Sequence, residues 1–236
     1  MVSKFVLIIL AKQQDGDAVW LADHWQSHNA VLISPSDLSK SGWSLRLATS
    51  NKSKICAGYR QITNKEIDGV LTLIPRVDSE DLDHIVPSDR QYVASEMSAF
   101  LLAWLSSRSC PVLNRPTADT LGGPGWRVEA WVHFASELGI PVSAIRRSTS
   151  RCIGDAKDQS LCEITVIGDE CFGNPIPQLY DNARILAKAA GTDLLTVRFA
   201  NSEPNSTFVN ANPWPNLASP ELADALLHCF EKRSAC

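Results

Sequence analysis

The feature that most constrains the fold of this chain is a run of six apolar residues at positions 5–10. A short run without polar alternation is typical of a central parallel strand that is buried on both faces. Helix and strand patterns alternate after it, starting with a helix predicted at residues 17–27. Further strands are predicted at residues 31–34, 43–48, 59–62 and 69–74. This alternation predicts a parallel sheet with helices packed on both of its faces.

The longest predicted helix covers residues 88–107. Pro87 precedes it, and Ser88 or Asp89 can cap it, because their side-chain oxygens accept hydrogen bonds from the free N–H groups of a first helical turn. Apolar side chains recur inside this segment at spacings of three and four residues, which predicts that one face of the helix packs on the core.

Two later segments carry the most specific motifs. In the first, a buried strand runs into a turn at residues 114–116, the Gly-rich residues 122–125 follow, and a helix is predicted at residues 127–138. Gly139 ends that helix, because glycine adopts positive φ without a Cβ clash. The second segment ends in Asn-Ala-Asn-Pro at residues 210–213. The remaining predicted strands and helices lie at residues 163–168, 176–190, 194–200, 206–210 and 220–232.

The order of these segments resembles the ATP-grasp superfamily. The resemblance implies an α/β fold, in which a Rossmann-like pre-ATP-grasp domain with a parallel sheet is followed by a small, truncated ATP-grasp-like α+β lobe. It places the first domain at residues 1–147, a linker at 148–161 and the lobe at 162–236. The family inserts a small sheet with phosphate-binding lysines where this chain has the linker, and Lys157 is the only lysine between residues 139 and 162.

The resemblance also implies a damaged metal site. Active ligases of this family carry an Asp and a Glu on their last strands, and the matching positions here hold Arg198 and Asn210. Only Asn212 matches the expected type of metal ligand. Because Mg²⁺ needs hard oxygen ligands, usually carboxylates, these replacements should weaken its binding severely. A shifted register would instead offer Asp193 or Glu203 as metal ligands.

Two arginines follow predicted strands, where ligands of parallel sheets gather. Arg76 stands where the resemblance expects an arginine after a strand, and Arg115 lies beside Asn114 in the turn after the next strand. Together they are predicted to hold a carboxylate or a peptide terminus by forked, charge-assisted hydrogen bonds. The alternative is that Arg115 only ties its turn to an acid such as Glu96.

Further candidate ligand residues surround the start of the helix at residues 127–138. Gly123 lies in a Gly-rich loop whose backbone N–H groups could face an anion at the helix N-terminus. Arg127 lies near the position at which active relatives begin their nucleotide contacts with a lysine. Trp126 and Trp131 either cover a pocket or pack on each other.

Composition excludes several classes of function. A net charge of −4 argues against nucleic-acid binding, which needs clustered Lys and Arg. No apolar stretch approaches the roughly 20 residues of a membrane-spanning helix. The seven cysteines form no C-x-x-C pair, so they predict neither a zinc site nor a disulfide framework, and a reducing cytoplasm is the expected location.

The leading hypothesis is therefore a catalytically degenerate ATP-grasp-like protein, a pseudoenzyme without a cofactor. It would bind a small acid, a peptide or a partner enzyme subunit, and serve a peptide or amino-acid modification pathway. The alternative is an active ATP-dependent carboxylate–amine ligase with a compact or subunit-shared nucleotide site, and only this alternative implies ATP and Mg²⁺. A third hypothesis is an interaction module that dimerises through its Trp-rich helices. A homo- or hetero-oligomer is compatible with all three.

Overall fold

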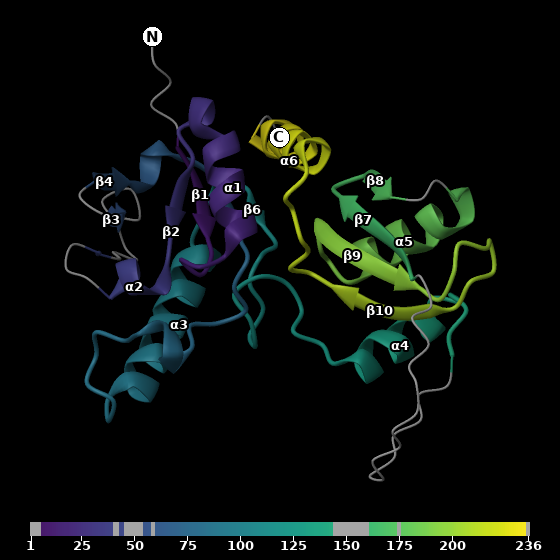
Figure 1. Ribbon diagram of the computed structural model, residues 1–236, viewed down its shortest axis with the longest axis horizontal. Helices are drawn as coiled ribbons and strands as arrows, with labels where there is room; N and C mark the ends of the chain where they lie inside the picture. The colour runs from purple at the N-terminus through teal and green to yellow at the C-terminus, as the bar shows by residue number, and fades with distance from the viewer. Residues whose placement is uncertain are drawn as a thin grey trace. The chain divides into compact units, whose positions relative to one another are not determined.

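A computed structural model of the protein describes residues 6–39, 43–44, 54–57, 60–143, 161–173 and 176–234. The chain divides into two compact units (Figure 1). Unit 1 consists of Met1–Pro124 and Asn216–Cys236, and unit 2 consists of Gly125–Pro215. Unit 2 is therefore inserted into a unit that contains both ends of the chain.

Unit 1 is built on a four-stranded parallel sheet of strand order β2-β1-β5-β6. Ile8 of β1 lies opposite Val31 of β2 on one side and Val70 of β5 on the other, so β1 is a central strand, as its apolar run predicts. All five residues of β1 are buried. The strands are β1 (Val6–Leu10), β2 (Val31–Ile33), β5 (Ile67–Thr72) and β6 (Val112–Leu113).

One of the predicted strands pairs outside the parallel sheet, and most of another falls outside the described residues. β3 (Lys54–Ala57) and β4 (Arg60–Thr63) form an antiparallel pair of their own, so the prediction that the strand near residues 59–62 joins the parallel sheet is wrong. The physical reason is the short connection, which allows a hairpin but not a parallel crossover. Of the strand predicted at residues 43–48, residues 45–48 lie outside the described part of the chain, and Ser44 forms an isolated bridge with Lys54.

Helices cover both faces of the parallel sheet. On one face, α3 (Arg90–Ser106) buries Leu101 and Trp104 against a core that includes Ile8 and Val70. The predicted cap of α3 is wrong in detail, because the carboxylate of Asp89 makes no cap bond and accepts a hydrogen bond from the Ser88 hydroxyl. The other helices of unit 1 are α1 (Gly16–His24), α2 (Pro35–Leu38) and α6 (Pro220–Ser234).

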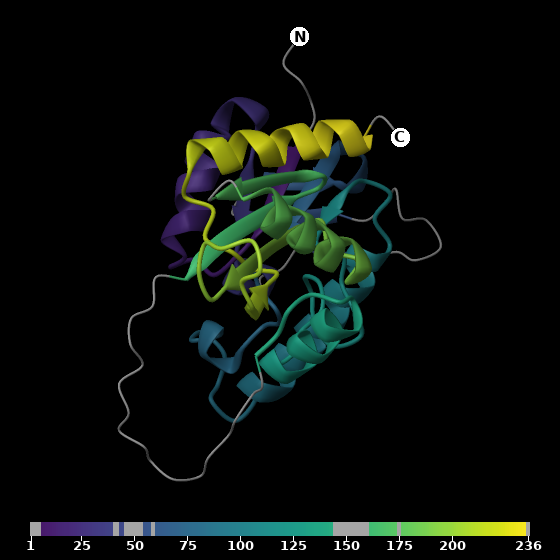
Figure 2. The same ribbon diagram turned by 90° about the vertical axis from the view of Figure 1, so that its right-hand side faces the viewer.

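The C-terminal helix α6 packs on the second face, next to α1 (Figures 1 and 2). A Cβ atom added at Gly69 of β5 would lie 2.6 Å from the Phe230 ring, so the absence of a side chain at Gly69 makes room for α6. The buried Trp25 donates from Nε1 to the Ala223 carbonyl at 3.3 Å, and its ring meets that of Phe230 edge-on at 6.3 Å. These contacts attach the end of the chain to unit 1.

Unit 2 is an antiparallel sheet of strand order β10-β9-β7-β8 with two helices on one face. Its core joins Trp131 and Leu186 from the helices to Ile164 and Val197 from the strands. Gly139 has a φ of 76°, as expected of the glycine after a helix. The elements are α4 (Val128–Glu137), β7 (Cys162–Ile167), β8 (Glu170–Gly173), α5 (Pro177–Ala189), β9 (Leu194–Phe199) and β10 (Phe208–Asn212).

Two details of unit 2 differ from the predictions. β8 was not predicted, and it pairs with β7 across a tight turn in which Gly168 has a φ of 59°. The last strand begins at Phe208 rather than at residue 206, because the Ser206 hydroxyl accepts a hydrogen bond from the Asn201 N–H and so belongs to the preceding turn.

The division into units also differs from the predicted domains at two helices. α4 was assigned to the first domain and lies in unit 2, whereas α6 was assigned to the C-terminal lobe and lies in unit 1. The predicted linker at residues 148–161, except Leu161, falls outside the residues described. Among the helices that are described, none combines the length and the apolar character that crossing a membrane requires.

Candidate functional site

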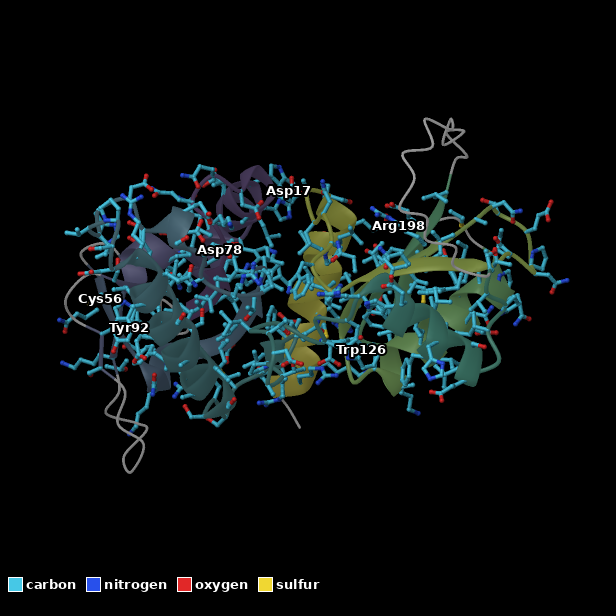
Figure 3. All side chains as sticks on the ribbon, turned by 90° about the horizontal axis from the view of Figure 1, so that it is seen from below. Asp17, Cys56, Asp78, Tyr92, Trp126 and Arg198 are labelled. Atoms are coloured by element: carbon cyan, nitrogen blue, oxygen red, sulfur yellow. The ribbon has the colours of Figure 1, made fainter. Side chains whose placement is uncertain are left out.

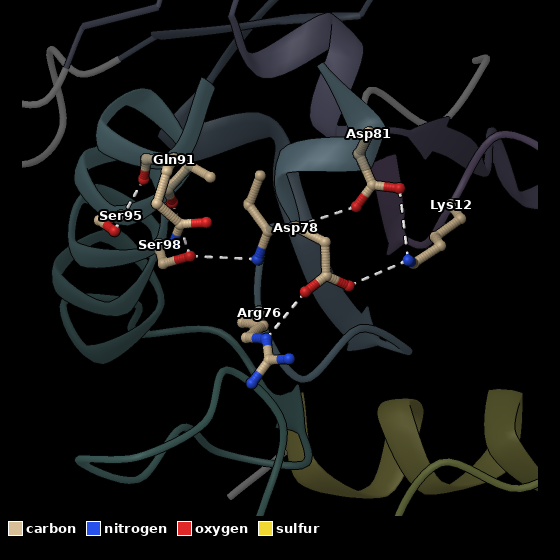
Figure 4. A network of polar contacts seen from close by, with 9 residues as sticks. Lys12, Arg76, Asp78, Asp81, Gln91, Ser95 and Ser98 are labelled. Carbon is tan, nitrogen blue, oxygen red and sulfur yellow. Dashed lines mark hydrogen bonds and ion pairs between the residues drawn. The ribbon is translucent and has the colours of Figure 1, made fainter. Parts of the chain in front are cut away.

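The carboxyl edge of the parallel sheet in unit 1 carries a network of charged side chains (Figure 4). Lys12 follows β1, and Arg76 and Asp78 follow β5, so the parallel arrangement brings them to one edge. Arg76 Nε donates to Asp78 Oδ1 at 2.8 Å, and Lys12 Nζ donates to Asp78 Oδ2 at 3.0 Å. The Asp78 carboxylate thus joins two cations from two strands.

The loop that carries Asp78 is held from two directions. A short 3-10 helix, Ser79–Asp81, begins after Asp78, whose N–H donates to Asp81 Oδ2 at 3.1 Å. Asp81 Oδ1 also lies 3.3 Å from Lys12 Nζ. On the other side, the Val77 N–H donates to the Ser98 hydroxyl of α3 at 3.1 Å. The two residues that follow Arg76 are therefore anchored to separate elements.

These contacts change the pKa values of the groups involved. The hydrogen bond from Arg76 lowers the pKa of Asp78; burial opposes this effect, and the Lys12 ammonium adds to it. Burial lowers the pKa of Lys12, but the hydrogen bonds and charges of Asp78 and Asp81 outweigh it and raise that pKa above its ordinary value. Asp78 and Lys12 therefore both carry their charges at neutral pH.

The lowered pKa of Asp78 predicts an acid-dependent loss of stability. Because the folded state favours the carboxylate, Asp78 contributes its full stabilisation above the unfolded pKa of about 3.9, and loses it as the pH falls through the folded pKa. We expect Asp78→Asn to be less stable than the wild type at neutral pH, with a difference that shrinks in acid. Denaturant unfolding between about pH 2 and pH 7 measures this. Asp23→Asn, at an exposed position of α1, is the matched control, and an equal difference at all pH values would contradict the prediction.

A pocket of about 250 Å³ lies beside Arg76. α3 contributes Ala99 and Leu102, and the loop after β6 contributes Asp119 and Leu121. This loop is tied to the loop after β5, because the Leu121 N–H donates to the Pro75 carbonyl at 2.8 Å. The pocket thus has apolar walls, with one cation and one carboxylate among its lining groups.

The other predicted ligand residues of unit 1 lie at the same edge but do not line this pocket. Asn114 is buried at the end of β6, with an exposed fraction of 1%. Arg115 is exposed, and within the described part of the chain it makes no ion pair with Glu96. The Gly123 N–H donates to the Arg115 carbonyl at 3.0 Å, so it serves the loop and not an anion.

Trp126 and Arg127 belong to unit 2, at the start of α4. Trp126 is 38% exposed, and its ring centroid lies 4.7 Å from that of Trp131 and 4.8 Å from that of Phe134. This geometry favours packing over a pocket-covering role. Arg127 is the exposed N-cap residue of α4, and no side chain caps the helix. Figure 3 marks Trp126 and also Arg198 of the same unit.

The face of the unit 2 sheet opposite its helices contains the predicted metal positions. Glu163 of β7, Arg198 of β9 and Asn210 of β10 lie directly opposite one another in register. Arg198 Nε donates to Glu163 Oε1 at 2.6 Å. Two residues along the strand, the Asn212 side chain bonds the backbone of Trp214: its Oδ1 accepts from the Trp214 N–H at 3.0 Å, and its Nδ2 donates to the Trp214 carbonyl at 2.8 Å.

These side chains do not fit Mg²⁺. The ion takes carboxylate and water oxygens in octahedral geometry, but the one carboxylate of this row is paired with a guanidinium, and the Asn212 amide is closed on its own chain. Within the described ranges, no three His, Cys, Asp or Glu side chains form a group that could hold a metal.

Sequence reasoning identified Arg76 and missed Lys12, Asp78, Asp81 and Asp119. Two signals were available for the first three. Lys12 lies two residues beyond the predicted first strand, and Asp78 and Asp81 have the spacing of a capping box. Nothing in the sequence marks Asp119, because the folding of its loop back to Pro75 brings it to the pocket.

No family model and no curated protein matches the chain. Solved structures do. The macrocyclase MdnC of Microcystis aeruginosa, bound with the precursor peptide MdnA, is 12% identical with a TM-score of 0.71, over 97% of this chain and 100% of that chain. A RiPP-associated ATP-grasp ligase of Chryseobacterium gregarium, in complex with ADP and a leader and core peptide, is 9% identical with a TM-score of 0.66, over 97% of each chain.

A third similar structure is a RimK domain ATP-grasp protein of Sphaerobacter thermophilus, which is 14% identical with a TM-score of 0.54, over 96% of this chain and 99% of that chain. At these identities the likeness concerns the fold. The chain has the fold of the ATP-grasp superfamily, which confirms the predicted resemblance and the predicted α/β class.

Proposed function

We propose that this ATP-grasp-fold protein binds a peptide and serves peptide modification without itself forming an amide bond. The peptide class is supported by two proteins of similar fold, MdnC and the Chryseobacterium gregarium ligase, which hold peptides in their structures. The charged carboxyl edge of unit 1, with Arg76 beside a pocket, offers a place for a peptide carboxylate.

One observation carries the non-ligating part of the proposal: the pairing of Arg198 with Glu163 on the face of the unit 2 sheet opposite its helices. Activation of a carboxylate by ATP depends on metal ions and cations placed around the transferred phosphoryl group. Here a guanidinium stands in the row in which the ATP-grasp resemblance places metal-binding acids. A fixed cation beside Glu163 disfavours a second, divalent cation at the same row by charge repulsion.

The experiment compares the wild type with the double variant Arg198→Asp, Asn210→Glu, which supplies two carboxylates to this row. We expect the variant to bind Mg²⁺ at least about tenfold more tightly than the wild type, a difference of about 1.4 kcal/mol. We also expect the wild type to release no ADP from ATP and Mg²⁺ in the presence of a peptide that carries Glu and Lys side chains. Calorimetry and coupled ADP detection measure the two quantities.

Thr165→Asp, Thr196→Glu is the matched control, because it adds the same two carboxylates two residues along on the same face and leaves Arg198 paired with Glu163. An equal gain of Mg²⁺ affinity in the control would show that added charge, and not relief of the Arg198 pair, sets the affinity. Peptide-dependent ADP release by the wild type, with loss of water from the peptide, would contradict the non-ligating proposal directly.

The second candidate function is an active ATP-dependent carboxylate–amine ligase with a compact or subunit-shared nucleotide site. It is favoured by the similar Chryseobacterium gregarium ligase, whose structure contains ADP. It is also favoured by the ATP-grasp ligase PsnB, which is 13% identical with a TM-score of 0.62 and whose structure contains Mg²⁺ and ADP. Under this candidate, the wild type releases ADP and phosphate in the same assay, and Arg115→Ala and Asn212→Ala lower the rate.

A further inference from the structure

Two charged side chains that line the pocket, Arg76 and Asp119, can still form hydrogen bonds with a ligand. The Arg76 side chain is 73% exposed, and its one contact with the described residues is made by Nε. Figure 4 shows its two terminal nitrogens away from the Asp78 carboxylate. On the loop after β6, the N–H of Asp119 donates to the Thr117 hydroxyl at 3.4 Å, whereas the carboxylate forms no hydrogen bond or ion pair within the part of the chain that the structure describes.

The other polar side chains of the pocket are already satisfied. The Ser98 hydroxyl donates to the Ala94 carbonyl at 2.9 Å and accepts from the Val77 N–H. The Thr120 hydroxyl donates to the Gly123 carbonyl. The rest of the lining is apolar and includes Pro75, Ala99, Leu102 and Leu121. A ligand would therefore contact the Arg76 guanidinium, the Asp119 carboxylate and an apolar wall.

The size of the pocket restricts the ligand further. Its volume of about 250 Å³ lies below the roughly 300–1,000 Å³ of pockets for drug-sized ligands. It is large enough for one amino-acid residue, while a longer segment would have to continue outside. The charges and the size together describe a residue with a carboxylate, a nearby nitrogen donor and an apolar side chain.

We propose that this pocket binds one apolar α-amino-acid residue, with its carboxylate on Arg76 and its nitrogen on Asp119. A free amino acid offers this chemistry through its ammonium group, and a peptide offers it through the amide N–H of its C-terminal residue. Arg76 supplies the two terminal nitrogens of the guanidinium, which match a carboxylate in forked geometry. The inference rests on the proposed peptide function and names the part of the peptide that is recognised.

Asp78 and Lys12 position Arg76 for this role. Because Asp78 holds Nε and is itself held by Lys12, the guanidinium is oriented before the ligand arrives. An oriented side chain loses less conformational entropy on binding, which favours affinity. The effect acts through Arg76, so Asp78 is a positioning residue and makes no contact with the ligand.

Calorimetry on the full-length protein tests the proposal with four probes: leucine, N-acetyl-leucine, leucinamide and 4-methylpentanoate. Leucinamide lacks the carboxylate and 4-methylpentanoate lacks the nitrogen, so both should bind about tenfold or more weakly than the better of the first two. Tighter binding of N-acetyl-leucine identifies a peptide C-terminus as the ligand, and tighter binding of leucine identifies a free amino acid.

Three variants assign the contacts. Arg76→Gln should weaken the better probe about tenfold or more, and Arg76→Lys should restore part of the loss, because lysine keeps the charge without the fork. Asp119→Asn should weaken leucine more than N-acetyl-leucine, since an ammonium loses a charge partner, whereas an amide N–H can still donate to the oxygen of the new side chain. Lys188→Gln, an exposed cation of α5 in unit 2, is the control and should change nothing.

Two results would overturn the proposal: no binding of leucine or N-acetyl-leucine by the wild type, or binding that survives Arg76→Gln in a protein with an unchanged unfolding curve. The proposed function fails by a different readout, namely peptide-dependent ADP release, which leaves the probe affinities untouched. Binding of leucine but not of N-acetyl-leucine would support the pocket and identify its ligand as a free amino acid.

Discussion

Phe230→Ala is expected to lower the free energy of unfolding of unit 1 by about 3–5 kcal/mol, the usual range for removing a buried aromatic ring. Phe230 lies on α6 with 3% of its surface exposed. Its ring fills the space that Gly69 leaves above β5 and meets the buried Trp25 edge-on. Alanine would leave a cavity between α6 and the sheet, and would remove an aromatic pair.

Hydrogen exchange measured residue by residue is the suitable readout, because it separates the two units. We expect amides of β1 and β5 to lose protection in Phe230→Ala, while those of β7 and β9 keep theirs. His228→Ala changes an exposed position of the same helix and should alter stability by no more than about 0.5 kcal/mol. Protection lost mainly in β7 and β9 would show that α6 stabilises unit 2, as the predicted domain boundaries imply.

The position of α6 illustrates what the sequence could not provide. The apolar run of β1 identifies a buried strand, because burial on both faces leaves no polar residue in it, and β5 is nearly as apolar, with Asp68 and Thr72 as its polar residues. The docking of α6 depends instead on a missing Cβ at Gly69, more than 150 positions earlier in the chain. A glycine inside a strand carries no signal about which distant ring approaches it.

The same limit applied to strand pairing. A short apolar run indicates a strand but not its partner, so β4 was assigned to the parallel sheet, although it pairs with β3. In unit 2, by contrast, the order of elements identified the last strands correctly. In their register Arg198 lies opposite Asn210. The sequence singled out these two residues only through the family resemblance.

The candidate site was accessible to sequence reasoning only in part. Arg76 was predictable, because ligands gather at the carboxyl ends of parallel strands and Arg76 follows such a strand. The network around it was less accessible: Lys12 also follows a predicted strand, but Lys12 and Asp78 come from different strands and meet only when β1 and β5 pair. Asp119 depends on how a loop of irregular structure returns to Pro75, and no periodicity predicts that path.

Trp131→Ala is expected to have a comparable effect on unit 2, about 3–5 kcal/mol. Trp131 is 1% exposed and belongs to a core with Ile164 and Val197 of the sheet. The chain after α4 adds to this attachment, since the Phe208 N–H of β10 donates to the Pro141 carbonyl at 2.7 Å. The indole therefore fixes α4 to the antiparallel sheet, although sequence reasoning placed this helix in the first domain.

Hydrogen exchange should show the loss in β7, β9 and β10, with β1 and β5 unaffected. His133→Ala on the same helix is the control: its side chain is 76% exposed, and its contact with Glu137 is a surface pair worth no more than about 1 kcal/mol. If Trp131→Ala instead released protection in β1 and β5, α4 would stabilise the parallel sheet, and the first domain would extend past Pro124 as the sequence suggested. Because Phe230→Ala and Trp131→Ala are expected to affect opposite units, the two experiments together establish which helix stabilises which sheet.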